Sequence, residues 1–265
     1  MRPSPGYLFC ERKLTIAVNF FGGRFLKEGI GAVGLTSVRA MFDRIAGVYD
    51  VMNTAMTAGL HHRWRSRAAD LAGVGPGSRV LDVATGTGDL AIELAKAVPA
   101  GKVIGLDPSA NMLAVATLKL AKRGLDGRVA LIEGDAQSLP QANCEIDAAT
   151  IAFGIRNVPD RPRALRELAR VVRPGGTIAV LELGEPRRSL LGRAAAFHTH
   201  HVVPRLGALL SGKREYRYLQ TSVAAFPPND EFAQIMRDSG LDVRKVIPLT
   251  FGVCTLFIAT PREDA

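Results

Sequence analysis

Residues 80–89 read VLDVATGTGD, a short apolar run that ends in a glycine-rich turn and opens a segment of helical spacing. Glycine tolerates the positive φ angles of a tight turn, and a turn without side chains lets a ligand approach the backbone closely. Gly86 and Gly88 supply both properties here. A strand, a glycine turn and a helix in this order predict the first unit of an α/β fold that binds a nucleotide-like ligand.

The chain that follows alternates between strand and helix patterns. We expect strands at residues 79–84, 102–107, 128–133, 146–151 and 177–182, and helices at 89–98, 109–123 and 161–172, with Ser109 as an N-cap. Such alternation produces right-handed βαβ units and a parallel sheet covered on both faces. After residue 182 we expect an apolar helical stretch (189–210), a helix (230–239) and two strands (241–247 and 250–260) joined by a turn at Pro248.

The composition is that of one globular domain with an N-terminal extension. The chain has 265 residues and a formal net charge of +9, which favours a negatively charged partner surface or simply reflects a basic proteome. Residues 1–40 combine glycines, prolines and bases with little periodicity, so we expect a poorly ordered basic extension before a single domain at residues 41–262. The three cysteines share no metal-ligand spacing, and no apolar run is long enough to span a bilayer. We therefore expect a reducing, cytoplasmic location.

Two further segments extend the ligand site expected at the glycine turn. Asp107 ends the second expected strand, where a carboxylate can accept hydrogen bonds from both ribose hydroxyls of an adenosine group. Asp135 and Ala136 follow the third expected strand, in a position to contact the adenine. Together with the turn, these residues predict an adenosine-containing ligand.

The identity of that ligand depends on the charges around the turn. Gly86, Gly88 and Ala91 satisfy the dinucleotide pattern, so an NAD(P)-binding oxidoreductase is the main alternative. Asp82 and Asp89 would crowd an anionic pyrophosphate but suit a ligand that carries a sulfonium and an ammonium group. These carboxylates favour S-adenosyl-L-methionine. A second interpretation makes Asp82 a structural carboxylate that pins the glycine loop.

Four segments match motifs of one enzyme family in residue type and spacing. They are residues 49–53 (YDVMN) with Met56, Thr57, His61 and Trp64; residues 153–158 (FGIRNV); residues 170–176 (RVVRPGG) with Glu182; and residues 216–219 (YRYL) with Ser222, Phe226 and Pro227. Over residues 41–262 the chain resembles the quinone-biosynthesis C-methyltransferases that act on demethylmenaquinone and on 2-methoxy-6-polyprenyl benzoquinol. Thr57, Arg173 and Gly184 depart from the family's usual Ser, Lys and Ser.

The resemblance implies a Rossmann-like class I methyltransferase fold, with a seven-stranded, mostly parallel sheet whose last strand is antiparallel. It implies S-adenosyl-L-methionine as the cofactor, with contacts from Thr87, Asp107, Asp135 and Ala136. It also implies methyl transfer to a ring carbon of a polyprenylated quinol, with demethylmenaquinol as the first candidate and the benzoquinol precursor of ubiquinone as the second. A scaffold that binds the cofactor but has lost catalysis is a further alternative, which the intact block at residues 153–158 disfavours.

Four residues are candidates for the methyl-transfer chemistry. A ring carbon becomes nucleophilic when a quinol hydroxyl loses its proton, and Arg156 and Asn157 could stabilise the resulting charge on oxygen. Alternatively, these two residues cap the helix that follows them. His61 could relay the proton or pack in the core, and Tyr49 could line the ring pocket or pack in the core.

The expected substrate determines the expected partners. A polyprenyl tail requires an apolar groove, for which residues 190–210 and the N-terminal extension are the candidates. The positive charge would support peripheral contact with an anionic membrane at the inner face of the cell membrane, and a homodimer is compatible with the sequence. We expect no nucleic-acid partner, because no basic tract interleaved with aromatic residues is present. We also expect no metal, since His198, His200 and His201 lack a further ligand nearby.

Overall fold

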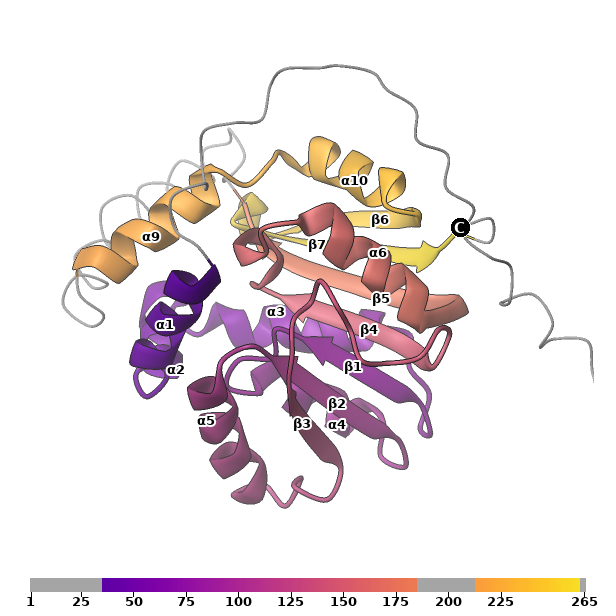
Figure 1. The fold of residues 1–265 in the computed structure, drawn as a ribbon, viewed down its shortest axis with the longest axis horizontal. Helices are drawn as coiled ribbons and strands as arrows, with labels where there is room; N and C mark the ends of the chain where they lie inside the picture. The colour runs from indigo at the N-terminus through magenta and orange to yellow at the C-terminus, as the bar shows by residue number, and fades with distance from the viewer. Residues whose placement is uncertain (1–34, 185–212, 263–265) are drawn as a thin grey trace, which may run out of the picture.

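The structure, a computed structural model, describes residues 35–184 and 213–262, in which helices flank both faces of one sheet (Figure 1). The seven strands lie in the order β3-β2-β1-β4-β5-β7-β6. The parallel pairs join β1 (Arg79–Val83), β2 (Lys102–Asp107), β3 (Val129–Glu133), β4 (Ile146–Ala152) and β5 (Val172–Leu183). β7 (Cys254–Pro261) pairs antiparallel with both β5 and β6 (Leu241–Leu249). The predicted mostly parallel sheet with an antiparallel last strand is confirmed.

Two apolar layers hold helices against this sheet. One layer joins the sheet to α6 (Arg161–Val171) and α10 (Asn229–Asp238), and the other joins it to α3 (Leu60–Leu71) and α4 (Asp89–Ala97). Successive side chains of β1 alternate between the layers, so that Leu81 lies in the first and Val80 in the second. Burial on both faces explains why the strands appear in the sequence as nearly continuous apolar runs.

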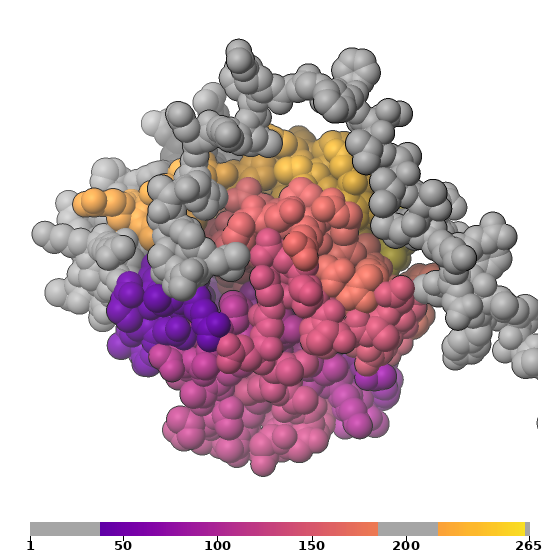
Figure 2. Space-filling view, viewed as in Figure 1, coloured from indigo at the N-terminus to yellow at the C-terminus, as the bar shows by residue number. Residues whose placement is uncertain are grey.

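Helices also cover one end of the sheet. We call α1 (Leu35–Ile45) and α2 (Tyr49–Thr57) the cap. The cap helices contact α5 (Ala110–Ala121), as the space-filling view also shows, and Met52, Met56 and Met112 are buried between them (Figure 2). The sequence patterns assign no helix before residue 79, and α1 begins ahead of the expected domain boundary at residue 40.

Three local expectations are corrected by the structure. The break expected at residues 173–176 lies inside β5, where Ile146 pairs with Val172 and a register shift absorbs the extra residues. Pro248 does not make the turn but lies in β6, an edge strand that tolerates a missing N–H. The turn falls instead at η3 (Thr250–Gly252), and β7 begins only at Cys254.

The remaining elements complete the described chain. η1 (Ile155–Asn157) follows β4, and α9 (Lys213–Ala224) lies beside the cap (Figure 1). Two segments with sequence-based expectations lie outside the described residues. They are the extension up to residue 34 and the apolar stretch at 189–210 with its three histidines. Within the described residues, every helix is too short or too polar to cross a bilayer.

Candidate functional site

A pocket lies between the cap and the carboxyl ends of β1, β2 and β4. It measures about 790 Å³, including the space where it opens to solvent, and we call it the sheet-edge pocket. Six of the residues singled out from the sequence line it: Tyr49, Gly86, Asp107, Asp135, Ala136 and Asn157. Ligands of open α/β sheets bind at this edge, because the loops after the parallel strands meet there.

Two backbone hydrogen bonds hold the side chain of Asp107 in the sheet-edge pocket. Its Oδ2 accepts a hydrogen bond from the backbone N–H of Gly86 at 2.8 Å, and its Oδ1 accepts one from that of Ser109 at 2.9 Å. Burial raises the pKa of the Asp107 carboxyl to about 6, although the two backbone hydrogen bonds oppose the shift. A carboxylate oxygen has more than one lone pair, so both oxygens can also accept from a ligand hydroxyl.

The glycine loop leaves room for a ligand in the same pocket. Gly86 has a φ of +56°, and a Cβ built on it would meet no atom of the described protein within 4 Å. Asp135 lies opposite and accepts hydrogen bonds from the backbone and side chain of Gln137 at 2.9 and 3.1 Å. An open glycine floor, a carboxylate that can take ribose hydroxyls and a buried Ala136 together fit an adenosine-containing cofactor.

Thr87 and Gly88, in the same loop region, do not line the sheet-edge pocket. Thr87 donates a hydrogen bond to Asp50 of α2 at 2.5 Å. Gly88 has a φ of +80°, and a Cβ there would lie 3.1 Å from that of Ala116, so this glycine lets the chain at the start of α4 pass close to α5. Their contacts are with the protein rather than with the pocket.

Asp82 is also occupied by protein contacts. Its two oxygens accept hydrogen bonds from the hydroxyls of Thr85 at 2.6 Å and Thr150 at 2.7 Å, and its residue is 1% exposed. Burial raises the pKa of the Asp82 carboxyl to about 6. Because Thr85 belongs to the glycine loop, these contacts support the second interpretation of Asp82, a structural carboxylate that pins the loop.

A second pocket adjoins the first. It measures about 430 Å³ and is lined mainly by apolar side chains of the cap and α9; we call it the cap pocket. Its lining residues are Met41, Phe42, Ile45, Tyr49, Met52, Asn53, Met56, Arg156, Tyr218 and Leu219. Phe42 and Tyr49 line both pockets and contact each other edge to face, with ring centroids 6.1 Å apart. These two rings form the boundary between the pockets.

Arg156 carries a buried charge into the wall of the cap pocket. It is 6% exposed, and its Nη1 donates to Glu182 at 2.5 Å and to the carbonyl of Phe153 at 2.8 Å. Burial disfavours the charged form of the guanidinium and so acts to lower its pKa. The attraction of the neighbouring Glu182 carboxylate outweighs this effect, and the pKa of Arg156 is raised. In the described part of the chain, the buried Nε of Arg156 has no hydrogen-bond partner. Arg156 therefore remains charged and retains an unused donor.

Asn157 lies on the other side of the same turn and lines the sheet-edge pocket. Its Oδ1 accepts a hydrogen bond from the hydroxyl of Tyr218 in α9 at 3.0 Å. Neither Arg156 nor Asn157 caps α6, because the side chain of Asp160 accepts from the N–H of Arg163 at 2.9 Å and is the N-cap. The capping alternative for the two residues is therefore not supported.

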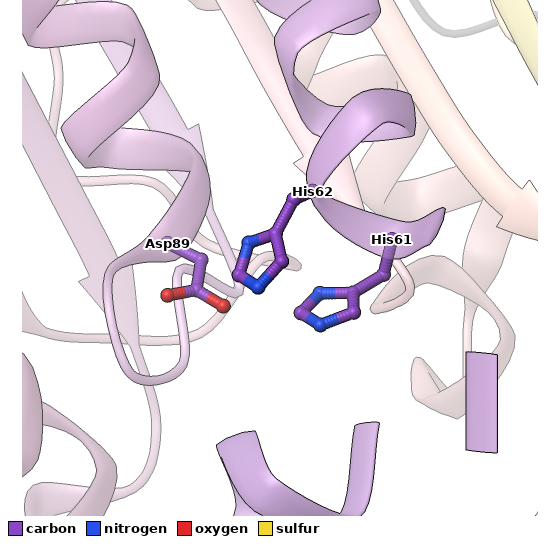
Figure 3. A group of neighbouring side chains, drawn as sticks. All are labelled: His61, His62 and Asp89. Carbon is purple, nitrogen blue, oxygen red and sulfur yellow. The ribbon is translucent and has the colours of Figure 1, made fainter. Parts of the chain in front are cut away.

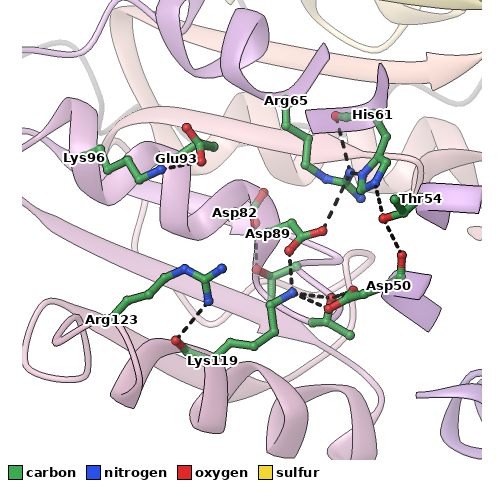
Figure 4. Close-up of polar contacts among 12 residues, drawn as sticks. Asp50, Thr54, His61, Arg65, Asp82, Asp89, Glu93, Lys96, Lys119 and Arg123 are labelled. Atoms are coloured by element: carbon green, nitrogen blue, oxygen red, sulfur yellow. Dashed lines mark hydrogen bonds and ion pairs between the residues drawn. The ribbon is translucent and has the colours of Figure 1, made fainter. Parts of the chain in front are cut away.

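His61 lines neither pocket, and its contacts fix it in a neutral form (Figure 4). Thr54 donates its hydroxyl hydrogen to the carbonyl of Asp50 at 2.8 Å, so it can only accept from His61 Nε2, which lies 3.1 Å away. The other ring nitrogen then accepts from Arg65. Burial and Arg65 lower the pKa of His61 to about 4. These contacts favour packing over proton relay, and the i, i+4 spacing of His61 and Arg65 is the signal for this pairing in the sequence.

His61, His62 and Asp89 form a group whose ligand atoms lie within 4.8 Å of one another (Figure 3). Two positively charged side chains of the protein already contact this group: Arg65 contacts His61, and Lys119 forms an ion pair with Asp89. A metal ion would have to displace both, so we assign no metal to this group.

Glu182 and Tyr218 are site residues to which the sequence patterns assign no role. Glu182 is 1% exposed at the end of an otherwise apolar strand, and a lone carboxylate in such a strand is a signal for a buried partner. Tyr218 is separated from Asn157 by most of the second half of the domain, and no local pattern predicts their contact.

Comparison with known proteins places this architecture in a family. The model of the ubiE/COQ5 methyltransferase family matches residues 31–261. The chain belongs to that family. It is therefore an S-adenosylmethionine-dependent C-methyltransferase, and S-adenosylmethionine is its cofactor. Family membership does not favour an NAD(P)-binding oxidoreductase.

Individual relatives cover most of the chain. The "Ubiquinone/menaquinone biosynthesis C-methyltransferase UbiE" of Syntrophotalea carbinolica is 46% identical over 83% of this chain and 92% of its own length. The "Demethylmenaquinone methyltransferase" of Thermus thermophilus is 43% identical over 82% of this chain and 98% of its own. A solved structure of a SAM-dependent methyltransferase from Aquifex aeolicus is 22% identical and aligns with a TM-score of 0.55 over 74% of this chain and 88% of its own. This last likeness supports the class I methyltransferase fold.

Proposed function

We propose that this methyltransferase transfers a methyl group from S-adenosylmethionine to a ring carbon of a polyprenylated quinol, and that demethylmenaquinol is its principal substrate. The observation that carries the proposal is the buried Arg156, which lines an apolar pocket next to the cofactor site and whose Nε–H has no hydrogen-bond partner among the described residues. The names of the relatives from Syntrophotalea carbinolica and Thermus thermophilus agree with a quinone ring as the substrate.

The sheet-edge pocket is the place for the cofactor, which supplies an electrophilic methyl group on a sulfonium. Asp107 would accept hydrogen bonds from its ribose hydroxyls, and Asp135 and Ala136 would contact its adenine. Gly86 would let it approach the backbone. Tyr49, on the boundary between the pockets, would face the reacting centre.

The cap pocket is the place for the quinol ring. A quinol oxygen that loses its proton pushes negative charge onto the neighbouring ring carbon, and a fixed cation stabilises that charge most strongly where water is excluded. Arg156 supplies the cation, and the methionines of the cap supply an apolar, adaptable wall. The enzyme's remaining contribution is to hold ring and cofactor at attack distance where the two pockets adjoin, beside Tyr49 and Phe42.

The choice of demethylmenaquinol over the ubiquinone precursor rests on the relative named as a demethylmenaquinone methyltransferase, which the chain covers almost completely. The test is a methyl-transfer assay with both reduced quinols and S-adenosylmethionine. We expect methyl transfer to demethylmenaquinol. In Arg156→Ala we expect kcat to fall by at least about a hundredfold, the loss typical of removing a donor that stabilises an oxyanion. Faster transfer to the benzoquinol would reverse the order of substrates. Full activity of Arg156→Ala would exclude its role.

The quinol tail and the net charge of +9 support a second proposal, that the enzyme works at an anionic membrane surface. Co-sedimentation with vesicles of anionic and of neutral phospholipid tests it. We expect binding to the anionic vesicles that weakens as salt is added; equal binding to both, or to neither, would contradict the proposal.

A further inference from the structure

Lys119 lies at the centre of a partly buried polar network outside both pockets (Figure 4). The residue comes from α5, and its side chain is 16% exposed. Its Nζ donates to Asp50 at 2.6 Å and to the hydroxyl of Thr87 at 3.2 Å, and it also forms an ion pair with Asp89. One ammonium group thus connects α2, the glycine loop, the start of α4 and α5.

Two of the three partners of Lys119 are neighbours of residues that line the pockets. Asp50 follows Tyr49 and belongs to α2, the helix that also carries Met52 and Asn53 into the cap pocket. Thr87 follows Gly86, which lies in the floor of the sheet-edge pocket. Lys119 therefore connects the helix that lines one pocket to the loop that lines the other.

The charges explain why this connection depends on Lys119. Asp50 and Asp89 are both negative, and Lys119 lies between them. Arg65 approaches Asp89 at 3.9 Å, and together with Lys119 it lowers the pKa of Asp89 in spite of burial. Without Lys119, the carboxylates of α2 and α4 would face each other in a partly buried site, which would push α2 away from the sheet.

We infer that Lys119 is a positioning residue for methyl transfer: through Asp50 and Thr87 it holds α2 in place over the glycine loop, and so keeps the methyl-acceptor ring aligned with the cofactor. The inference rests on the proposed function, in which the cap pocket receives the ring. In this role Lys119 contacts neither substrate but determines how the two are aligned. A displacement of about 1 Å between two reactants lowers the rate by up to about a hundredfold, so a shift of α2 should be visible in turnover.

The test uses Lys119→Met, which keeps an unbranched side chain of nearly the same length but removes its charge, and Lys119→Arg, which keeps the charge. Lys96→Met is the matched control, because the side chain of Lys96 is 61% exposed in α4 and, among the described residues, its ion pair is the local one with Glu93. We expect Lys119→Met to lower kcat with the quinol by about tenfold or more and to change the Kd for S-adenosylmethionine by less than about threefold. Lys119→Arg should recover most of the rate, and Lys96→Met should match the wild type.

Hydrogen exchange supplies a readout that does not depend on catalysis. In Lys119→Met the amides of α2 should exchange faster while those of α6 and α10 keep their wild-type rates, because only the attachment of α2 is weakened. Asp50→Asn removes the other end of the same ion pair and should reproduce this exchange pattern even if Lys119→Met folds poorly. In the double variant, the loss of rate should be much smaller than the product of the two single losses.

Two results would overturn the inference. One is wild-type exchange of α2 together with a wild-type kcat in Lys119→Met; the other is a double variant whose losses simply multiply. A wild-type enzyme that methylates neither quinol would instead refute the proposed function, and the exchange of α2 would still decide whether Lys119 holds the cap.

Discussion

Replacing Glu182 by Gln should destabilise the protein strongly, although the two side chains have nearly the same size. The substitution keeps the shape of the side chain but removes the negative charge that faces Arg156, and these residues are 1% and 6% exposed. Oε1 of Glu182 accepts from Arg156 Nη1 and from the N–H of Leu183 at 2.8 Å, and Oε2 accepts from the N–H of Arg156 at 3.2 Å. In Glu182→Gln one of the two oxygens is replaced by an NH₂ group, which cannot accept a hydrogen bond. That NH₂ group faces an N–H donor in either orientation of the amide, so at least one hydrogen bond is lost.

The magnitude follows from the burial of the pair. Breaking a buried ion pair by removing one partner costs about 3–5 kcal/mol, since the remaining charge is left in a medium of low polarity. We take the lower end, about 3 kcal/mol, because Gln keeps the packing and part of the hydrogen bonding. The exposed pair of Glu93 and Lys96 provides the comparison, and Glu93→Gln should cost less than about 1 kcal/mol.

Urea unfolding followed by the fluorescence of Trp64 measures both variants. Trp64 is the single tryptophan of the chain, it is 4% exposed, and its indole N–H donates to Thr250 at 2.9 Å, so its emission should report loss of the packed core. A loss of less than about 1 kcal/mol for Glu182→Gln, or equal losses for the two variants, would refute the claim that the buried Arg156 charge depends on Glu182.

Three further predictions concern the cofactor site and the glycine loop. Asp107→Asn should weaken S-adenosylmethionine binding about tenfold in calorimetry, because hydrogen bonds to a charged group contribute ~1.5–3 kcal/mol; an unchanged Kd would remove Asp107 from the site. Gly88→Ala should cost about 1–3 kcal/mol in urea unfolding, because of its φ of +80° and the 3.1 Å approach to Ala116, and wild-type stability would contradict that packing. Burial raises the pKa of Asp82 from 3.8 to about 6, so the stability it contributes at low pH is lost as the pH rises through 6. Asp82→Asn should reduce this decline between about pH 4 and 6, and an unchanged slope would show that Asp82 is not its source.

The fold of the α/β layer was predictable because its signals are local. The strands are apolar runs covered on both faces, and Ser109 caps α5 as expected, accepting from the N–H of Met112 at 3.1 Å. The cap was not predictable in the same way. Its polar attachments join distant segments, as when Ser109 donates to Asp43 at 2.5 Å.

The site residues likewise fall into those that local sequence signals predict and those that depend on distant partners. Gly86 and Asp107 were predictable, because a glycine turn and an acid after the next strand are close in the fold by construction. The environment of Arg156 was not, since it depends on a distant partner that determines whether a polar side chain is used by the protein or left for a ligand. For Arg156 the decisive partner, Glu182, arrives from another strand.

Three buried carboxylates of the sheet show how such partners determine a role. Asp82 is enclosed by two hydroxyls, and Glu182 is neutralised by Arg156, so the protein itself satisfies both. Asp107 receives only two backbone N–H groups, and it lines the sheet-edge pocket, whereas the other two do not. A buried carboxylate that stays charged requires further donors. Since the described protein offers Asp107 only those two, the missing donors are best supplied by a ligand, and the ribose hydroxyls of the cofactor have the right chemistry.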